Sequence, residues 1–359
     1  MRYNVIRHTI RSTEDFSNLK TAWEALETGN EMTAFQTYFW NALLLEQWLR
    51  SQLRRSQSSV EIYIACHDEQ PVMILPLLIV RFSLHIKEIG WHRGIYLLGT
   101  DSVSDYLNAI YNAFDAGALE ALLKSLRRDH PALDIRFDLI REDTSLHRYL
   151  SGCGFAGTEC AVFADIPVPE SGEAYEKLLS KSTRQNLRTA ANRADRDGIN
   201  YQTELLLGTL PPSIAARLNK LHAKRVETIR AKALPNHVIK RAYRKLYHWT
   251  LRRREQRYPI VMESMIRNPH SVVFIVRLRE QLAGYLYGTA DSQSVRIIHN
   301  CFDEEFRWYS PLSRGCHDFI LGECETRQLG VSSIDFTRGD ETYKLKLGCT
   351  AHKLYSYSL

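Results

Sequence analysis

The stretch VVFIVRLREQLAGYLYG, residues 272–288, places two apolar runs on either side of a charged turn. Runs of β-branched, aromatic and aliphatic residues that flank a short polar turn are typical of an antiparallel hairpin. Residues 61–79, EIYIACHDEQPVMILPLLI, repeat this arrangement, and the same Glu-Gln dipeptide stands at the turn of both stretches. The sequence therefore predicts two similar hairpins, one in each half of the chain.

The elements that follow each hairpin also correspond. Residues 119–139 and residues 316–336 both indicate a helix followed by a strand. Gly330, just after the second of these helices, suits the left-handed backbone at a helix C-terminus. The shared order predicts an α+β protein of two domains in tandem, residues 1–166 and 167–359, each a mixed and mostly antiparallel sheet flanked by helices.

Composition places the chain among ordinary globular proteins. Of its 359 residues, 44% are hydrophobic and 25% are charged, and disorder is not expected at these values. No apolar run is long enough to indicate a membrane span, and the N-terminus lacks the pattern of a signal peptide. The seven cysteines form no C-x-x-C pair, and no His, Asp or Glu cluster has the spacing of metal ligands. We expect a cytoplasmic protein with reduced thiols and no metal.

Positive charge is concentrated in one segment of the second half. Residues 224–257 contain 12 Lys and Arg against Glu227 and Glu255, a local balance of +10, whereas the whole chain carries +6. Such clustering fits a partner rich in phosphate, such as a nucleotide, coenzyme A, a tRNA or a lipid headgroup. It also fits the solvent-exposed face of a helix over 237–257, which Pro259 would end.

Six stretches, taken in chain order, resemble the CelD-like acyltransferases of the GNAT superfamily, which are related to the FemABX peptidyltransferases. They are AFQTYFW (34–40), PVMILPLLI (71–79), LLGTDSVSDYL (97–107), LSKSTRQNLRTAANRA (179–194), YSPLSRGCHDFIL (309–321) and IDFTRGDETYK (334–344). The resemblance implies two GNAT-like domains and transfer of an acyl group to an amine of a sugar or another small acceptor. It also implies acyl-CoA as the donor and a role in polysaccharide or cell-envelope biosynthesis. FemABX relatives take an aminoacyl group from a tRNA instead, so both donors stay open.

The start of the helix after residue 309 is the expected place for the donor. Acyl-CoA sites of GNAT proteins carry a glycine-rich loop whose backbone N–H groups bind the pyrophosphate. Here the sequence offers Ser310 as an N-cap, Pro311 as the first helical residue and Gly315 as the remaining glycine. We assign these three residues to donor binding, although the shortened glycine pattern departs from the family.

Ionisable residues gather after the strand SSIDFT, where the resemblance places the catalytic machinery. Amide formation needs a neutral amine, a polarised carbonyl and a protonated leaving group. Lys344 is the candidate for stabilising negative charge, Tyr343 for protonating the leaving group, and Asp340 for positioning Lys344 or accepting an amine proton. Arg338 is a candidate for binding substrate, and so is Lys346, which competes with Lys344 as the counterpart of a FemABX lysine.

The same residues also fit a surface turn without a catalytic role. In that interpretation, Arg338 pairs with Asp340 and Glu341 pairs with Lys344, each pair contributing at most about 1 kcal/mol. No Ser-His-Asp arrangement with a G-x-S-x-G turn occurs in the sequence, and a GNAT-type site requires none.

His299, in the strand RIIHNCF, is a candidate general base, because an imidazole changes charge near neutral pH. A buried, hydrogen-bonded core histidine is the alternative. Asp105 and Tyr106 follow the strand IYLLG and would suit a cationic amine or sugar hydroxyls, or would form a helix cap. Arg184 and Arg188 lie one helical turn apart and could bind a phosphate together, or could be a solvent-facing stripe.

Two other functions remain open from the sequence. The basic segment and the shortened glycine loop favour an aminoacyl-tRNA-dependent transferase of FemABX type. A non-catalytic module that uses its basic face to bind nucleic acid or membrane is the other alternative. The sequence does not identify the acceptor or the oligomeric state.

Overall fold

The computed structural model describes residues 3–81, 92–100, 104–232 and 258–359. The chain forms two compact units, Met1–Val162 together with His352–Leu359, and Phe163–Ala351. Of the basic segment 224–257 only residues 224–232 are described, and the helix expected over 237–257 lies outside the described residues. The units differ from the expected domains 1–166 and 167–359 in two respects: the boundary falls after Val162, and His352–Leu359 belong with the first unit.

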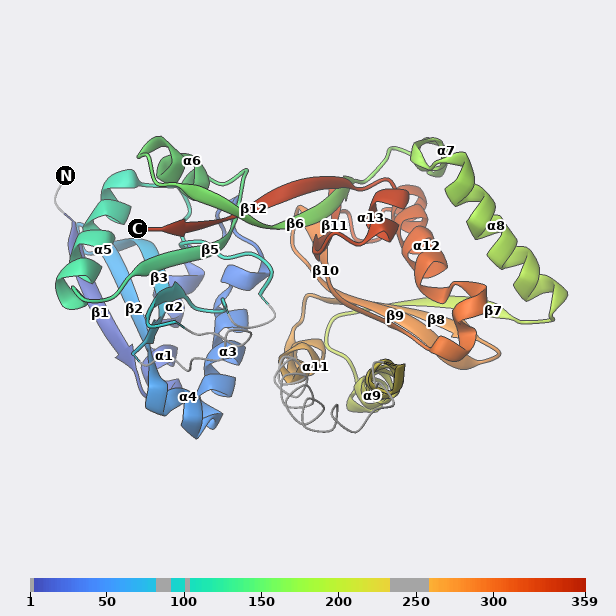
Figure 1. Ribbon diagram of the computed structural model, residues 1–359, viewed down its shortest axis with the longest axis horizontal. Helices are drawn as coiled ribbons and strands as arrows, with labels where there is room; N and C mark the ends of the chain where they lie inside the picture. The colour runs from blue at the N-terminus through green and yellow to red at the C-terminus, as the bar shows by residue number, and fades with distance from the viewer. Residues whose placement is uncertain (1–2, 82–91, 101–103, 233–257) are drawn as a thin grey trace, which may run out of the picture. The chain divides into compact units, whose positions relative to one another are not determined.

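The first unit is a six-stranded mixed sheet with helices (Figure 1). The strand order is β1-β2-β3-β4-β5-β12, in which only β4 and β5 run parallel. Helix α5 packs on β1, β2 and β3. The elements are β1 (Asn4–Ile10), α1 (Thr13–Ser17), α2 (Lys20–Glu24), η1 (Ala34–Gln36), α3 (Tyr38–Arg50), α4 (Gln52–Gln57), β2 (Ser58–His67), β3 (Gln70–Val80), β4 (Gly94–Leu97), α5 (Ala116–Asp129), β5 (Ile135–Arg141), α6 (Ser145–Gly152) and β12 (Thr350–Ser358).

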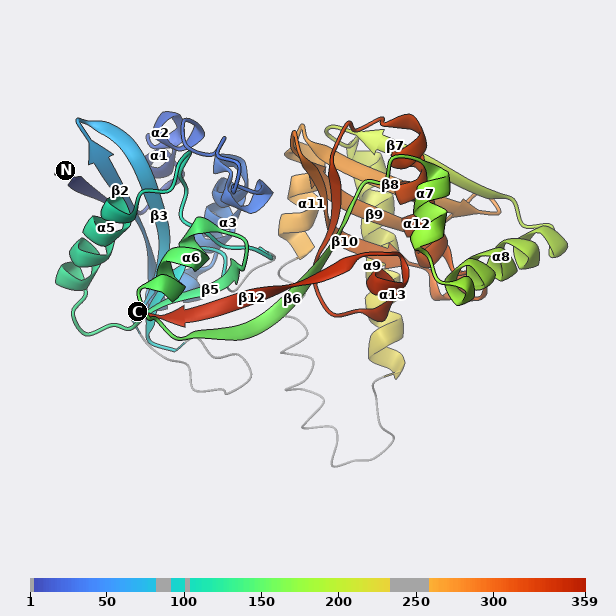
Figure 2. The ribbon, with the colours of Figure 1, turned by 90° about the horizontal axis from the view of Figure 1, so that it is seen from above.

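The second unit has the same strand plan. Its order is β7-β8-β9-β10-β11-β6, and only β10 and β11 run parallel. In this unit α9 and α11 lie on one side of the sheet, and α12 lies on the other with α7 beside it (Figures 1 and 2). The elements are β6 (Gly157–Pro167), α7 (Gly172–Leu178), α8 (Lys181–Arg196), β7 (Tyr201–Leu207), α9 (Pro212–Lys232), α11 (Tyr258–Arg267), β8 (Ser271–Leu278), β9 (Gln281–Ala290), β10 (Ser294–Phe302), η2 (Glu304–Tyr309), α12 (Pro311–Thr326), β11 (Ser333–Arg338) and α13 (Thr342–Lys346).

The two predicted hairpins are confirmed. Strands β2 and β3 pair antiparallel, as do β8 and β9. Each turn contains two successive residues of positive φ, Asp68 and Glu69 in the first and Arg279 and Glu280 in the second. Two such residues define the turn that matches the right-handed twist of the flanking strands. The two units therefore have the same kind of turn in corresponding hairpins, which supports an internal repeat.

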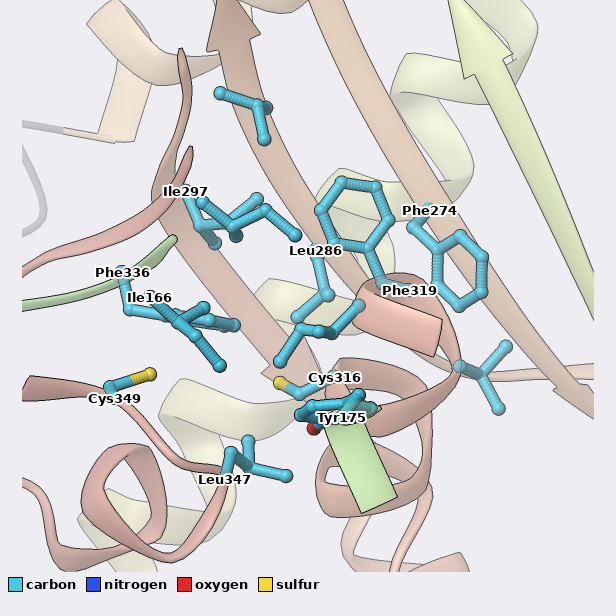
Figure 3. Close-up of a cluster of buried hydrophobic side chains, with 14 of the residues drawn as sticks. Ile166, Tyr175, Phe274, Leu286, Ile297, Cys316, Phe319, Phe336, Leu347 and Cys349 are labelled. Atoms are coloured by element: carbon cyan, nitrogen blue, oxygen red, sulfur yellow. The ribbon is translucent and has the colours of Figure 1, made fainter. Parts of the chain in front are cut away.

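The core of the second unit lies between its sheet and α12 (Figure 3). Phe319 and Cys316 of α12 pack in one cluster with Ile297 of β10 and with Ile334 and Phe336 of β11. The expected alternation of β11 is therefore confirmed, because its two apolar side chains share the core face.

All seven cysteines are free thiols, and five of them are buried. Within the described residues, no group of three His, Cys, Asp or Glu side chains could hold a metal ion. None of the described helices combines the length and the apolar character that crossing a membrane requires.

Candidate active site

The parallel strands β10 and β11 pair for a short distance and then become irregular. Their parallel register covers Ser294–Arg296 and Ser333–Asp335. Beyond it, β10 shifts register against β9 between Ile297 and His299. A bulge redirects the side chains that follow it and commonly lies next to an active site. The distortion therefore marks the middle of this sheet as a candidate site.

Strand β11 is distorted at the same level. Its register against β6 shifts between Asp335 and Arg338, and between them Thr337 has a φ of 54°. A left-handed backbone is costly for a β-branched residue, by about 1–3 kcal/mol. Hydrogen bonds offset this cost. The Thr337 N–H donates to Oδ1 of Asp335 over 2.7 Å, and its hydroxyl donates to the carbonyl oxygen of Ile297 over 2.8 Å.

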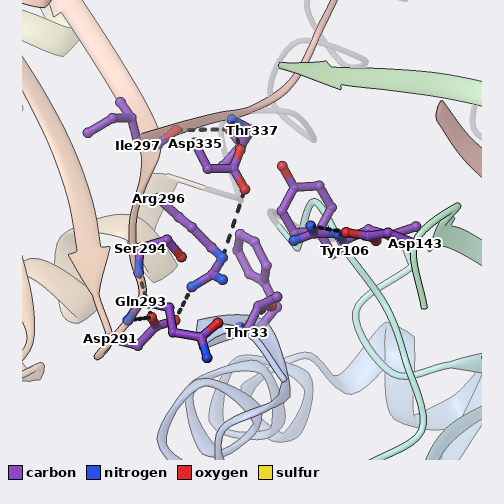
Figure 4. Close-up of polar contacts among 12 residues, drawn as sticks. Thr33, Tyr106, Asp143, Asp291, Gln293, Ser294, Arg296, Ile297, Asp335 and Thr337 are labelled. Carbon is purple, nitrogen blue, oxygen red and sulfur yellow. Dashed lines mark hydrogen bonds and ion pairs between the residues drawn. The ribbon is translucent and has the colours of Figure 1, made fainter. Parts of the chain in front are cut away.

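A buried charge cluster supports the paired ends of these strands (Figure 4). Arg296, 7% exposed, forms an ion pair with Asp291, and its Nε lies 3.8 Å from Oδ2 of Asp335. Burial alone would raise the pKa of Asp291, but Arg296 and backbone N–H groups hold it below its ordinary value. Asp291 therefore keeps its charge, and its ion pair with Arg296 holds the start of β10 just before the bulge.

Four aromatic side chains gather directly after the bulge. His299 of β10 and His222 of α9 share a hydrogen bond, with 3.2 Å between Nε2 of the former and Nδ1 of the latter. The His222 ring stacks on Tyr258 of α11, with centroids 3.5 Å apart and planes 9° apart. The hydroxyls of Tyr258 and of Tyr285 from β9 are 2.8 Å apart, and the His299 ring meets both tyrosines edge-on.

Both imidazoles of this group are uncharged at neutral pH. Burial, with a smaller contribution from His222, lowers the pKa of His299 to about 3. Burial also lowers the pKa of His222 to about 4. A neutral imidazole has one N–H donor and one acceptor nitrogen. His299 can therefore accept or donate a hydrogen bond throughout the neutral range, without the change of charge that its sequence position suggested.

Lys344 is 3% exposed and is held by the turn that precedes it. Its ammonium group donates to the carbonyl oxygens of Thr337, Arg338 and Gly339 over 3.1, 3.1 and 3.4 Å. It also lies 2.9 Å from Oε2 of Glu341. The expected Glu341–Lys344 pair is thus present, and the three N–H donors of this lysine are engaged within the protein.

The other residues of this cluster differ in exposure. Tyr343 is partly buried, and its hydroxyl accepts a hydrogen bond from Nδ2 of Asn300 over 3.2 Å. Burial raises the pKa of Tyr343, so its phenol stays protonated. Arg338 ends β11 and is partly exposed, whereas Asp340 and Lys346 are exposed. The position expected for Asp340 beside Lys344 is occupied by Glu341.

Helix α12 begins at the expected residue, but its N-cap side chain does not make the expected capping hydrogen bond. Ser310 is the N-cap in a left-handed conformation, and its side chain makes no capping hydrogen bond. Pro311 is the first helical residue and is buried. A Cβ added at Gly315 would lie 2.7 Å from Cγ2 of Val276, so this glycine lets the helix approach β8 closely. Packing thus accounts for Gly315 without a ligand.

The arginine pair on α8 is divided between two environments. Nη1 of Arg184 donates to the carbonyl oxygens of Glu176 and Leu179 over 2.7 and 3.0 Å and thereby holds the end of α7. Arg188 is exposed. Of the two side chains that the sequence assigned to one phosphate, Arg184 thus already donates to backbone carbonyls, whereas Arg188 is exposed to solvent.

Asp105 and Tyr106 lie in the first unit and are buried. The Tyr106 ring packs edge-on against Phe35 with 5.6 Å between centroids, and its carbonyl oxygen accepts from Nε2 of Gln36 over 3.0 Å. Arg141 lies over the same ring, 5.1 Å from its centroid. Tyr106 therefore belongs to the packing of the first unit.

Sequence reasoning found His299 but not its partners. His222 and Tyr258 come from two helices far from β10 in sequence, and Tyr285 comes from the neighbouring strand. Tyr285 alternates with Leu286 of the core, but a two-residue period on β10 would place His299 on the core side with Ile297. Only the bulge between Ile297 and His299 brings this histidine to the side of Tyr285, and the sequence does not mark it. No local pattern marks His222, since its role depends on the packing of α9 against β10.

One protein-family model matches the chain over residues 181–345, and it describes an acetyltransferase (GNAT) domain. The matched segment runs from the start of α8 into α13 and contains the distorted β10–β11 pair. The second unit is thus similar to a GNAT acetyltransferase domain. Among curated proteins, none matches the sequence.

Several solved structures share the fold. A protein of unknown function from Bacteroides thetaiotaomicron aligns with a TM-score of 0.54 and 11% identity over 99% of this chain and 100% of that chain. The C-terminal domain of a protein from Agrobacterium fabrum, named as a lysylphosphatidylglycerol synthetase, aligns with a TM-score of 0.52 and 11% identity over 97% and 92%. L-PGS from Bacillus licheniformis aligns with a TM-score of 0.51 and 8% identity over 95% of this chain and 91% of that chain. At these identities the likeness shows a common fold. The expected α+β class, with two units of the same mixed and mostly antiparallel strand plan, is confirmed, and the GNAT match covers part of the second unit.

Proposed function

We propose that this protein is an N-acyltransferase that moves an acyl group from acyl-CoA to an amine of a sugar or another small acceptor. One observation carries the proposal. The GNAT match at 181–345 contains the place where β10 and β11 stop pairing, and two residues of β10 just beyond it, His299 and Asn300, hydrogen-bond to His222 and to the protonated Tyr343. We further place the reaction in cytoplasmic polysaccharide or cell-envelope biosynthesis, as the family resemblance implies.

The residues have separate roles in this proposal. The acceptor amine attacks the thioester carbonyl, so a proton leaves the amine and the CoA thiolate takes one up. Tyr343, whose phenol burial keeps protonated, gives its proton to the thiolate. His299 receives the amine proton. Asn300, which donates to the Tyr343 oxygen, orients the phenol.

Lys344 acts through the backbone in this scheme. Its ammonium binds the three carbonyls of residues 337–339, and these residues join the distorted part of β11 to α13. We assign it to holding Tyr343 in place and Arg338 and Asp340 to the acceptor side. Ser310 and Pro311 begin the helix whose first backbone N–H groups meet the phosphates of the donor.

The experiment has a binding arm and a chemical arm. Acetyl-CoA and longer acyl-CoAs at about 100 times Kd should raise the unfolding free energy by about 2.7 kcal/mol. Mass spectrometry of reactions with a panel of amino sugars and small amines should detect an N-acylated product. Tyr343→Phe should lose about 10²-fold or more in kcat while acyl-CoA still binds. The proposal would be refuted if no acyl-CoA gave a thermal shift and no acyl-CoA gave an acylated product.

Aminoacyl-tRNA is a second candidate donor, favoured by the surface of α8. This helix is rich in Arg and Lys, and Arg193 lies 3.9 Å from the ring centroid of Trp308, which is 60% exposed. Exposed aromatic rings among basic side chains bind nucleic acids. Binding of aminoacyl-tRNA that weakens steeply between 50 and 200 mM salt, with transfer of the aminoacyl group, would select this donor. Binding without any transfer would instead indicate a non-catalytic basic module.

A further inference from the structure

The histidine pair beside the β10 bulge has a feature that a single general base lacks. Its two rings are joined through Nε2 of His299 and Nδ1 of His222. In the described part of the chain, neither Nδ1 of His299 nor Nε2 of His222 makes a hydrogen bond, so each ring keeps one nitrogen for another partner. The pair thus connects two ring nitrogens through one internal hydrogen bond.

We propose that His299 and His222 form a proton relay for the acceptor amine, in which His222 is a positioning and proton-transferring residue supplied by α9. The inference rests on the proposed acyltransferase function. The N–H bond of the attacking amine breaks, and its proton binds to Nδ1 of His299. At the same time the proton on Nε2 of His299 moves to Nδ1 of His222, and the proton on Nε2 of His222 passes to water. Both rings end as neutral tautomers, and one proton has left the site.

The surroundings favour a relay over a charged imidazole. An imidazolium at either ring is strongly disfavoured, because burial lowers the pKa values of His299 and His222 to about 3 and 4. Among the described residues, the titratable groups in ring contact with the pair are Tyr258 from α11 and Tyr285 from β9, and burial raises the pKa of both phenols. No described carboxylate is among their hydrogen-bond or ring partners to stabilise a positive ring. A tautomer exchange creates no net charge on either imidazole and avoids this cost.

The aromatic packing fixes the geometry that a relay requires. Stacking on Tyr258 sets the plane of the His222 ring, and Tyr258 is itself held by the 2.8 Å contact between its hydroxyl and that of Tyr285. Tyr285 also borders the His299 ring. The two imidazoles meet at 74°, with their nitrogens at hydrogen-bond distance. Both rings are therefore restrained from elements other than their own.

The first arm of the test needs no acceptor. NMR of the full-length protein with ¹⁵N-labelled histidine should show both imidazoles neutral from pH 6 to pH 8, each in a defined tautomer. His222→Phe keeps a ring to stack on Tyr258 but removes the hydrogen bond, so it should shift the His299 tautomer equilibrium. His270→Asn, at an exposed position, is the matched control and should leave His299 unchanged. If the ¹⁵N signals of His299 were the same in His222→Phe as in the unaltered protein, the proposed hydrogen-bonded pair would be wrong.

The second arm measures catalysis with the amine that the panel identifies. His222→Asn keeps an amide oxygen near the position of Nδ1 but cannot pass on a proton. It should lower kcat about 10- to 100-fold with the KM for acyl-CoA unchanged, and it should remove the multiproton solvent isotope effect of the unaltered protein. Unchanged turnover in His222→Asn would overturn the relay and leave the acyltransferase function standing. Absence of transfer by the unaltered protein would overturn both, and the NMR arm would still report whether the hydrogen bond exists.

Discussion

Lys344 shows how a single buried charge can define a turn. Its ammonium donates to the carbonyls of residues 337–339 and pairs with Glu341, and the side chain is almost fully buried. A buried carbonyl without a donor costs about 1–3 kcal/mol. The turn between β11 and α13 therefore depends on this lysine for its backbone hydrogen bonds.

Replacing Lys344 by Met should lower the unfolding free energy by roughly 2–4 kcal/mol, because several buried acceptors lose their partner at once. Lys346→Met, two residues further along the same helix at an exposed position, is the matched control and should change stability by less than about 0.5 kcal/mol. Urea denaturation followed by circular dichroism measures both. Equal stability of the two variants would show that the Lys344 contacts contribute nothing to the turn.

The same cluster shows which part of a site can be predicted from sequence. The spacing of Glu341 and Lys344 predicted their ion pair, and the strand pattern predicted that Ile334 and Phe336 share one face. Burial of Lys344 against backbone carbonyls was not predictable, since it depends on the positive φ of Thr337. A β-branched residue gives no sequence signal for that conformation.

At the scale of elements, α12 is fitted closely to the sheet of the second unit. Two glycines lie in this helix. A Cβ at Gly315 would lie 2.7 Å from Cγ2 of Val276, whereas a Cβ at Gly322 would meet nothing within 4 Å. From the sequence, Gly315 was assigned to the donor phosphates. A glycine of a phosphate-binding loop and a glycine needed for close helix–sheet packing give the same sequence signal, and only the contact with Val276 distinguishes them.

The two glycines predict opposite effects for one substitution. Gly315→Ala should destabilise by about 1–3 kcal/mol through overpacking, and Gly322→Ala should stabilise by up to about 1 kcal/mol through helix propensity. Adding Val276→Ala to Gly315→Ala should recover part of the loss by opening space. Thermal melts compare the three variants, and acyl-CoA titrations on the double variant separate packing from ligand binding. A destabilised Gly322→Ala would contradict this assignment.

The contact between α12 and α7 depends on a histidine. His317 lies 2.7 Å from Oε1 of Glu176 on α7 and 3.0 Å from Oδ1 of Asp318. Burial alone would lower the pKa of His317, but the hydrogen bonds to Asp318 and Glu176 raise it above its ordinary value. The folded state therefore binds the proton more tightly than the unfolded chain does.

A raised pKa in the folded state sets the direction of the pH dependence. The stability from protonated His317 is fully present below the unfolded pKa of about 6.5, and it is lost as pH rises through the folded value. The unaltered protein should therefore exceed His317→Gln by roughly 1–3 kcal/mol at pH 5.5, and by less at pH 8.5. Urea midpoints at the two pH values measure this difference. A gap that widens with pH would mean that the neutral imidazole is the stabilising form.

At the scale of the whole molecule, each unit takes its sixth strand from the far end of the other half of the sequence. The C-terminal β12 pairs with β5 in the first unit, and the second half of β6 pairs with β11 in the second. Sequence predicted the repeated plan, because each hairpin, helix and strand leaves a local pattern. It did not predict this exchange, since strands β6 and β12 have the same local pattern whichever sheet they join.

The exchange predicts that the last residues of the chain stabilise its first unit. Tyr357 is buried against Gly157, and its hydroxyl lies 2.8 Å from both Oγ of Ser151 and Nδ1 of His147. Tyr357→Ala removes a large core side chain and should cost about 3–5 kcal/mol, whereas Tyr357→Phe loses only the hydroxyl contacts and should cost about 1 kcal/mol.

Hydrogen exchange measured by mass spectrometry locates this effect. In Tyr357→Ala the amides of β5 and α6 should lose protection while those of β8 and β9 keep it, because local stability follows the unit that loses its packing. Loss of protection in β8 and β9 with β5 unchanged would place β12 with the second unit and refute the exchange. Equal loss throughout would mean that the two units unfold as one cooperative body, so the comparison separates strand membership from cooperativity.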